Sequence, residues 1–94
     1  MNNLLDNKRK LLLFKSHRRG MRELDIFLLK FAEKYLKTLS ENDLNQYEKI
    51  LDESDNDLYS WFFNQTSIPK KHYNKVTKLL LSMHVNEELE RISK

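Results

Sequence analysis

The sequence contains no cysteine, and only one glycine and one proline among its 94 residues. The missing cysteine excludes disulfides and thiolate metal sites, and it is typical of a protein in a reducing compartment. One glycine cannot form a glycine-rich phosphate-binding loop. The chain also lacks the Asn-Gly and Asp-Gly pairs that close tight β-hairpins. Together these absences favour a helical protein.

Long apolar runs are absent as well. The stretch Leu11–Phe14 has only four apolar residues, which is too short for a secretory signal core and far short of the ~20 that cross a bilayer. The first ten residues lack the Arg- and Ser-rich composition of a mitochondrial transit peptide. We therefore expect a protein of the bacterial cytoplasm that does not insert stably into a membrane.

Helical periodicity occurs in nearly every segment and predicts an all-α fold, a compact five-helix bundle. At 94 residues the chain should form a single domain, residues 1–94. The expected helices cover about residues 4–18 and 21–39, and three more begin near residues 40, 54 and 70. The second is the most apolar, so it should lie at the centre. Residues 86–94 either continue the last helix or fray.

The first expected helix has an apolar face and a candidate stop signal. Leu4, Leu5, Leu11 and Leu12 share this face, and Phe14 widens it. Gly20 fits the left-handed residue that closes a helix.

The other helix starts are marked by capping residues. Ser40 with Asp43 three residues later resembles a capping box, and either Ser54 or Asp55 caps the fourth helix. Leu58 and Trp61 in that helix are expected in the core.

Charge is distributed unevenly along the chain. Residues 1–22 hold seven basic residues and one acid, residues 40–57 hold seven acids and one base, and residues 65–84 hold four lysines and no acid. This segregation leaves three binding modes open: phosphate contacts with nucleic acid, a membrane surface, or a protein partner that meets basic and acidic faces.

The sequence contains no recognisable motif of a catalytic, cofactor-binding or metal-binding site. His17, His72 and His84 are far apart, and none lies four residues from another. An EF-hand loop starting at Asp52 or Asp55 would lack the glycine at its sixth position and the glutamate at its twelfth. We therefore expect no enzymatic activity, no bound metal and no cofactor held by this chain.

Two motifs resemble those of a known family. The first is Arg-Gly-x-x-Glu at residues 19–23, and the second is Asp-x-Asp-Leu-x-x-Trp at residues 55–61. Together with their spacing they resemble the succinate dehydrogenase assembly factors, from about His17 to Asn64. The chain departs from the family pattern at Asn56, where proline is common, and in the segment that precedes Arg19, where an aromatic is common.

The resemblance implies a function. Family members bind the flavoprotein subunit of succinate dehydrogenase, and in some bacteria that of fumarate reductase, and promote covalent attachment of FAD to it. The FAD then belongs to the partner flavoprotein. The resemblance implies a chaperone that is not an enzyme. We also expect a monomer that does not bind nucleic acid; a small basic nucleic-acid-binding protein is the alternative.

The motifs also give the candidate partner-binding residues, which are Arg19, Gly20, Met21, Arg22, Glu23, Asp55 and Asp57. Arg19 and Glu23 are the expected centre of the contact. On this hypothesis an Arg19→Glu variant folds nearly as the wild type does but does not support flavin attachment. Asp55 and Asp57 are expected mainly to cap their helix.

Overall fold

The computed structural model describes residues 3–17 and 19–93, with side chains placed in 4–17 and 19–84. Five α-helices occur in this part of the chain: α1 (Asn3–Ser16), α2 (Arg22–Tyr35), α3 (Glu41–Leu51), α4 (Asp55–Phe63) and α5 (Lys75–Ser93); a 3-10 turn, η1, covers Lys70–His72. The prediction of an all-α five-helix fold is confirmed.

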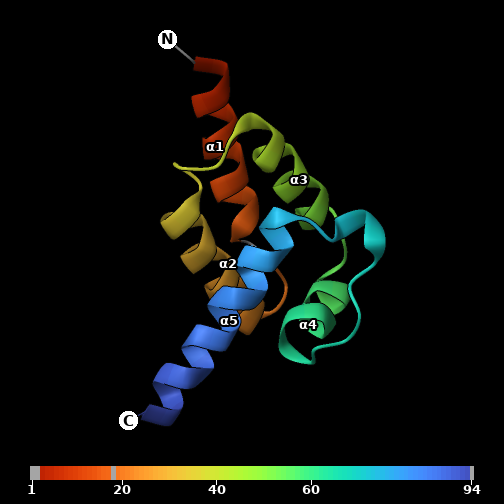
Figure 1. Ribbon diagram of the computed structural model, residues 1–94. Coiled ribbons are helices and arrows are strands. Elements are labelled where there is room, and N and C mark those ends of the chain that lie inside the picture. The colour runs from red at the N-terminus through yellow and green to blue at the C-terminus, as the bar shows by residue number, and fades with distance from the viewer. Residues whose placement is uncertain (1–2, 18, 94) are drawn as a thin grey trace.

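The helices pack around α2, as its apolar composition predicted. Helix α2 contacts α1, α4 and α5, and the ring of Phe31 also packs against Tyr47 of α3; α3 in turn contacts α1 and α5. Figure 1 shows α5 crossing in front of α2, with α4 and the segment before α5 on one side. The Cα radius of gyration is 13.2 Å, close to the ~13 Å expected for a folded domain of about 100 residues.

The core is a single apolar cluster to which all five helices contribute. Aromatic side chains lie at its centre: the ring of Phe31 is 5.1 Å from that of Tyr47, and the ring of Phe27 is 5.8 Å from that of Phe62. Leu58 is fully buried and Trp61 is only 7% exposed, which confirms both core predictions. The starts of α2 and α4 are therefore anchored in packed residues.

The predicted caps of α3 and α4 are present. The hydroxyl of Ser40 accepts a 3.1 Å hydrogen bond from the Asp43 amide, and that of Ser54 accepts one of 3.1 Å from the Asp57 amide. Each satisfies an amide that has no partner inside its helix. Ser54, and not Asp55, therefore caps α4.

Two helix boundaries differ from the sequence-based ones. Helix α2 ends at Tyr35 and not near Leu39, because Arg9 of α1 reaches across and donates to the carbonyl oxygens of Leu36 (2.8 Å) and Leu39 (3.1 Å). Helix α5 begins at Lys75, after η1, because the Asn74 side chain accepts from the first free amides of that helix. Helix α5 then continues to Ser93, and Lys94 lies outside the described residues.

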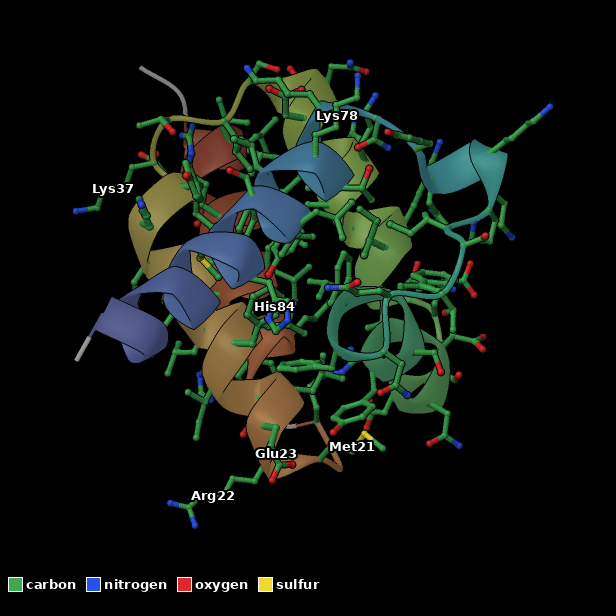
Figure 2. All side chains as sticks on the ribbon, turned by 60° about the horizontal axis from the view of Figure 1, so that its bottom comes forward. Met21, Arg22, Glu23, Lys37, Lys78 and His84 are labelled. Atoms are coloured by element: carbon green, nitrogen blue, oxygen red, sulfur yellow. The ribbon has the colours of Figure 1, made fainter. Side chains whose placement is uncertain are left out.

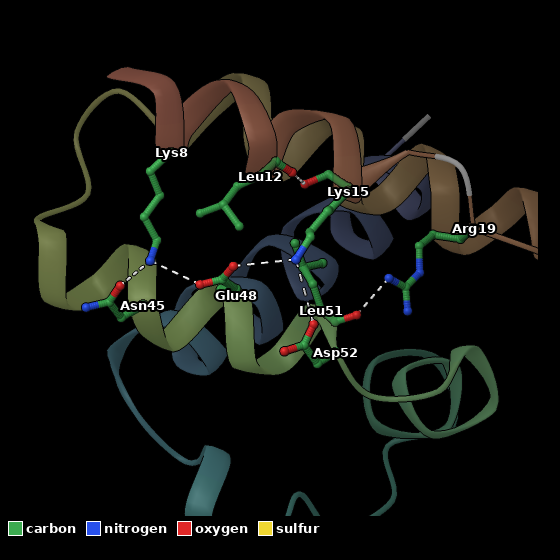
Figure 3. Close-up of polar contacts among 9 residues, drawn as sticks. Lys8, Leu12, Lys15, Arg19, Asn45, Glu48, Leu51 and Asp52 are labelled. Carbon is green, nitrogen blue, oxygen red and sulfur yellow. Dashed lines mark hydrogen bonds and ion pairs between the residues drawn. The ribbon is translucent and has the colours of Figure 1, made fainter. Parts of the chain in front are cut away.

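The apolar face expected for the first helix is only partly buried. Leu12 is fully buried, but Leu4, Leu11 and Phe14 are 84%, 47% and 51% exposed. Polar side chains set the orientation of α1 instead. Figure 3 shows Lys8 and Lys15 reaching from α1 to Glu48 of α3, at 3.0 and 3.4 Å, with Asn45 and Asp52 as further partners.

Candidate functional site

Arg19 connects the segment between α1 and α2 to the segment between α3 and α4. Its Nε donates to Oδ1 of Asp55 at 2.7 Å, while its Nη1 and Nη2 donate to the carbonyl oxygens of Leu51 (2.8 Å) and Glu53 (2.9 Å). Leu51 is the last residue of α3, where a cation complements the negative helix end. The side chain is only 13% exposed, so its donors are directed inward.

Gly20 lies against the same carboxylate. Its amide donates to Oδ2 of Asp55 at 2.6 Å, and a Cβ built on Gly20 would lie 3.1 Å from that oxygen. Its φ is not positive, so the prediction of a left-handed helix stop is wrong. Helix α1 has already ended at Ser16. The position favours glycine because the backbone approaches the Asp55 carboxylate closely.

Asp55 therefore has a role that its expected capping function did not include. Because Ser54 caps α4, both carboxylate oxygens of Asp55 are available, one for Arg19 and one for Gly20. We call Arg19, Gly20 and Asp55 the motif junction, since they join the two motifs found in the sequence. The opposite charges of Arg19 and Asp55 were the one sequence signal for this contact. Two residues that are 36 positions apart form no local pattern, so the signal could not identify the pair.

The other predicted residues lie on the solvent side of the junction. Met21 precedes α2 and is partly buried against the core, whereas Arg22, Glu23 and Asp57 are exposed. In Figure 2, Arg22 and Glu23 project from the start of α2, and Arg22 points away from the molecule. Neither has an ion-pair partner among the described residues. We call Arg22, Glu23 and Asp57 the exposed motif residues; Met21 is not one of them, because it is partly buried.

A second polar contact, which the sequence did not reveal, supports the junction. Nε2 of His72 lies 2.5 Å from Oε2 of Glu53, and the buried His72 ring packs 5.6 Å from that of Trp61. The hydrogen bond from His72 lowers the pKa of the Glu53 carboxyl, and Lys71 acts in the same direction. Since the Glu53 carbonyl holds Arg19, Trp61 is linked to the junction through His72 and Glu53.

A buried polar pair fixes the end of α1 near the junction. The hydroxyls of Ser16 and Tyr47 are 2.6 Å apart, and Ser16 also donates to the carbonyl of Leu12 at 2.7 Å. Tyr47 is therefore the donor to Ser16. Burial raises the pKa of Tyr47 well above its usual value, while the hydrogen bond with Ser16 and the charge of Arg19 act in the opposite direction.

The shape of the molecule beside the motif junction suits binding to the surface of another protein. The cavity beside it is open, has a volume of about 350 Å³ and is lined by Phe14, Lys15, Arg19, Leu51, Asp52 and Asp55. Among the described residues, no cluster of three or more His, Asp or Glu side chains has the arrangement of a metal site. In the same part of the chain, no helix has the length and apolar composition needed to span a membrane.

Comparison with known proteins gives consistent matches. Residues 10–84 match the family described as flavinator of succinate dehydrogenase. The chain is 42% identical over 88 residues to "Succinate dehydrogenase assembly factor 2, mitochondrial" of Lodderomyces elongisporus, covering 89% of this chain and 54% of that protein. Proteins of the same name from Saccharomyces cerevisiae and Danio rerio are 40% and 38% identical, covering 98% and 93% of this chain and 59% and 56% of theirs.

Two facts follow from these matches. The chain spans between 54% and 59% of the length of the three relatives. All three are named as mitochondrial, which contradicts the expectation of a bacterial cytoplasmic protein. That expectation depended on the missing cysteine, the short apolar run and the composition of the first ten residues, and none of these identifies a compartment.

Proposed function

Because the chain belongs to the flavinator family of succinate dehydrogenase, we propose that it binds the flavoprotein subunit of that enzyme and promotes covalent attachment of FAD to it. The observation that carries this proposal is the match over residues 10–84, which includes both motifs and the whole motif junction. The mitochondrial relatives support a mitochondrial location for this activity. The match gives no support to the nucleic-acid alternative.

The contacts suggest that the seven predicted binding residues have different roles. Arg19, Gly20 and Asp55 act from within, because their polar groups bind one another and the end of α3. The exposed motif residues then supply the groups that touch the partner. Holding the starts of α2 and α4 together before binding lowers the conformational entropy lost on association.

In this mechanism the chain contributes binding energy and no catalytic residue. The FAD belongs to the flavoprotein, whose own histidine forms the bond to it. Binding favours the conformation of the flavoprotein in which that histidine and the flavin are aligned. An open, charged face of the kind at the motif junction suits such a role, since it can cover part of a larger protein.

The test is reconstitution with purified flavoprotein lacking covalent flavin, free FAD and this chain, with covalent flavin read by in-gel fluorescence. Glu23→Gln and Arg22→Ala should each reduce attachment by about tenfold or more, if each contact contributes ~1.4 kcal/mol or more. Glu33→Gln is the matched control, because Glu33 is an exposed carboxylate at the other end of the same helix. Equal attachment with all three variants would contradict the proposal.

Three further experiments test the choice of partner, FAD binding by the chain itself and its oligomeric state. The flavoprotein of fumarate reductase replaces that of succinate dehydrogenase in a parallel reaction, and attachment there would extend the range of partners. Titration of the chain alone with FAD should leave FAD fluorescence unchanged if the cofactor belongs to the partner. Size-exclusion chromatography with light scattering should give the 11.4 kDa mass of a monomer.

A further inference from the structure

A second cavity lies between α4, the segment that follows it, and α5. Its volume is about 550 Å³, within the ~300–1,000 Å³ typical of ligand pockets. Trp61, Phe62, Ile68, Tyr73 and Leu81 form apolar walls. Only Trp61 among these residues belongs to the two motifs, so the proposed function does not account for this cavity.

His84 of α5 lines the same cavity and is held by packing. The ring is 5.1 Å from that of Phe63 and 6.0 Å from that of Phe27, both edge-on, and the residue is 9% exposed. Its Nδ1 is buried and has no hydrogen-bond partner in the described part of the chain. Figure 2 shows the ring near the middle of the molecule, on the side of α5 that faces α2. A buried polar atom without a partner is rare in folded proteins and marks a place that is not packed for stability alone.

One edge of the cavity is a largely exposed loop without regular secondary structure, residues 65–69, of which 65–68 line the cavity. It starts at Gln65, whose φ is 56°, a conformation uncommon for a residue other than glycine. Ile68 is restricted to extended backbone by Pro69. The Thr66 amide donates to the carbonyl of Ser60 at 3.1 Å, but those of Ser67 and Ile68 have no intramolecular acceptor among the described residues. These two amides are available to a second chain.

The segments that form the cavity are basic, although none of the described lysines lines the cavity itself. Residues 65–84 carry Lys70, Lys71, Lys75 and Lys78 and no acid. Lys71 and Lys75 have acidic partners in Glu53 and Asp43, both at 3.4 Å. Lys78 lies over the ring of Tyr73, 5.5 Å from its centroid, and Lys70 is exposed. In the described structure neither Lys70 nor Lys78 is paired with a carboxylate.

We propose that this cavity is a docking site for an extended, acidic segment of a protein partner, with one bulky apolar side chain of that segment inserted between Trp61, Tyr73 and Leu81. The free amides of Ser67 and Ile68 hydrogen-bond to the backbone of the segment, as in recognition of extended peptides at exposed strand edges. Carboxylates of the segment lie beside Lys70 and Lys78. The apolar wall, the free amides and the unpaired cations favour this occupant over a nucleic acid or a neutral small molecule.

The experiment uses the full chain, labelled with ¹⁵N, and a capped peptide of sequence Asp-Glu-Val-Phe-Asp-Glu. Binding is followed by amide shifts and by the fluorescence of Trp61, the only tryptophan. The amides of residues 65–68 and 81–84 should shift, and the apparent Kd should be about tenfold lower than for peptides with lysine in place of the acids or glycine in place of valine and phenylalanine.

Matched charge reversals test whether the site is local. Lys78→Glu should weaken binding about fivefold or more, whereas Lys37→Glu, an exposed lysine that follows α2, should change it by less than about twofold. Equal weakening by both variants would reveal non-specific attraction. That result, shifts confined to other residues, or no saturation up to about 2 mM acidic peptide would each overturn the proposal. No flavoprotein is used, so the outcome is independent of the proposed function.

Discussion

The guanidinium of Arg19 lies 2.7 Å from the carboxylate of Asp55 and joins two motifs that are 36 residues apart in the chain. Both partners are shielded, with 13% and 28% of their side chains exposed. An arginine that also holds the carbonyl oxygens of Leu51 and Glu53 contributes to the fold before any partner binds.

Removing either partner should therefore destabilise the chain. Arg19→Ala removes the donor to Oδ1 of Asp55 and to two carbonyl oxygens, although Oδ2 keeps the Gly20 amide, and we expect it to lower the free energy of unfolding by about 3 kcal/mol. Urea unfolding of Arg19→Ala, Asp55→Ala and the double variant should give a coupling energy of ~1–3 kcal/mol. Strictly additive effects would contradict the contact.

The same contacts change one expectation drawn from the sequence. Arg19→Glu would place a carboxylate beside Asp55 and two carbonyl oxygens, so it should unfold the chain and not leave a stable, inactive variant. The exposed Glu23 and Arg22 are better positions at which to separate binding from folding.

Gly20→Ala tests the close approach to Asp55. The added Cβ would lie 3.1 Å from Oδ2, so the carboxylate must move and its 2.6 Å bond to the Gly20 amide must lengthen. We expect a loss of about 1 kcal/mol in unfolding free energy, part of the value of a hydrogen bond to a charged group. In an Asp55→Ala background the same substitution should have almost no effect, since the obstructing oxygen is gone. A similar loss in both backgrounds would point to backbone strain instead.

Local features of the fold could be predicted from the sequence. The caps at Ser40 and Ser54 depend on residues three apart, and the central position of α2 follows from its apolar periodicity. Each of these predictions depends only on the residues of a single helix and its cap.

Features that depend on tertiary contacts could not be predicted. The roles of Asp55, Glu53 and His72 arise where segments far apart in sequence meet. The exposure of Leu4 and Leu11 has a related cause, because polar contacts of α1 with α2 and α3 determine which of its apolar residues are buried. Periodicity alone assigns one face to a helix but not its rotation against its neighbours.

Trp61→Ala should cost about 3–5 kcal/mol, as expected for a large buried aromatic. The substitution opens a cavity beside Phe62 and removes the ring that packs 5.6 Å from His72. Thermal unfolding should show a large drop in Tm, and Trp61→Phe should lose clearly less because it keeps part of the volume. A Trp61→Ala variant as stable as the wild type would show that the ring does not pack in the core.

The Glu53–His72 contact predicts a pH dependence of stability. The pKa of Glu53 is lowered in the folded state, mainly by the hydrogen bond from His72. Its contribution is therefore complete above the unfolded-state pKa of ~4.3 and is lost as the pH falls through the lower folded-state value. The difference in unfolding free energy between wild type and Glu53→Gln should shrink as the pH falls below ~4.3. A difference that grows in that range would contradict the shift.

Gln65→Gly should stabilise the chain. Gln65 follows the C-cap residue Asn64 of α4 and has a φ of 56°, which lets the next amide, that of Thr66, turn back to the Ser60 carbonyl. A left-handed conformation costs a residue with a side chain ~1–2 kcal/mol, whereas glycine adopts it freely but loses ~0.5–1 kcal/mol more in chain entropy. The net gain in unfolding free energy should be up to about 1.5 kcal/mol, measured by urea unfolding. Asn64→Gly is the control: its φ is −100°, so glycine brings only the entropic loss and should destabilise. If both substitutions lower stability, the conformation of Gln65 is not the strained one that the structure shows.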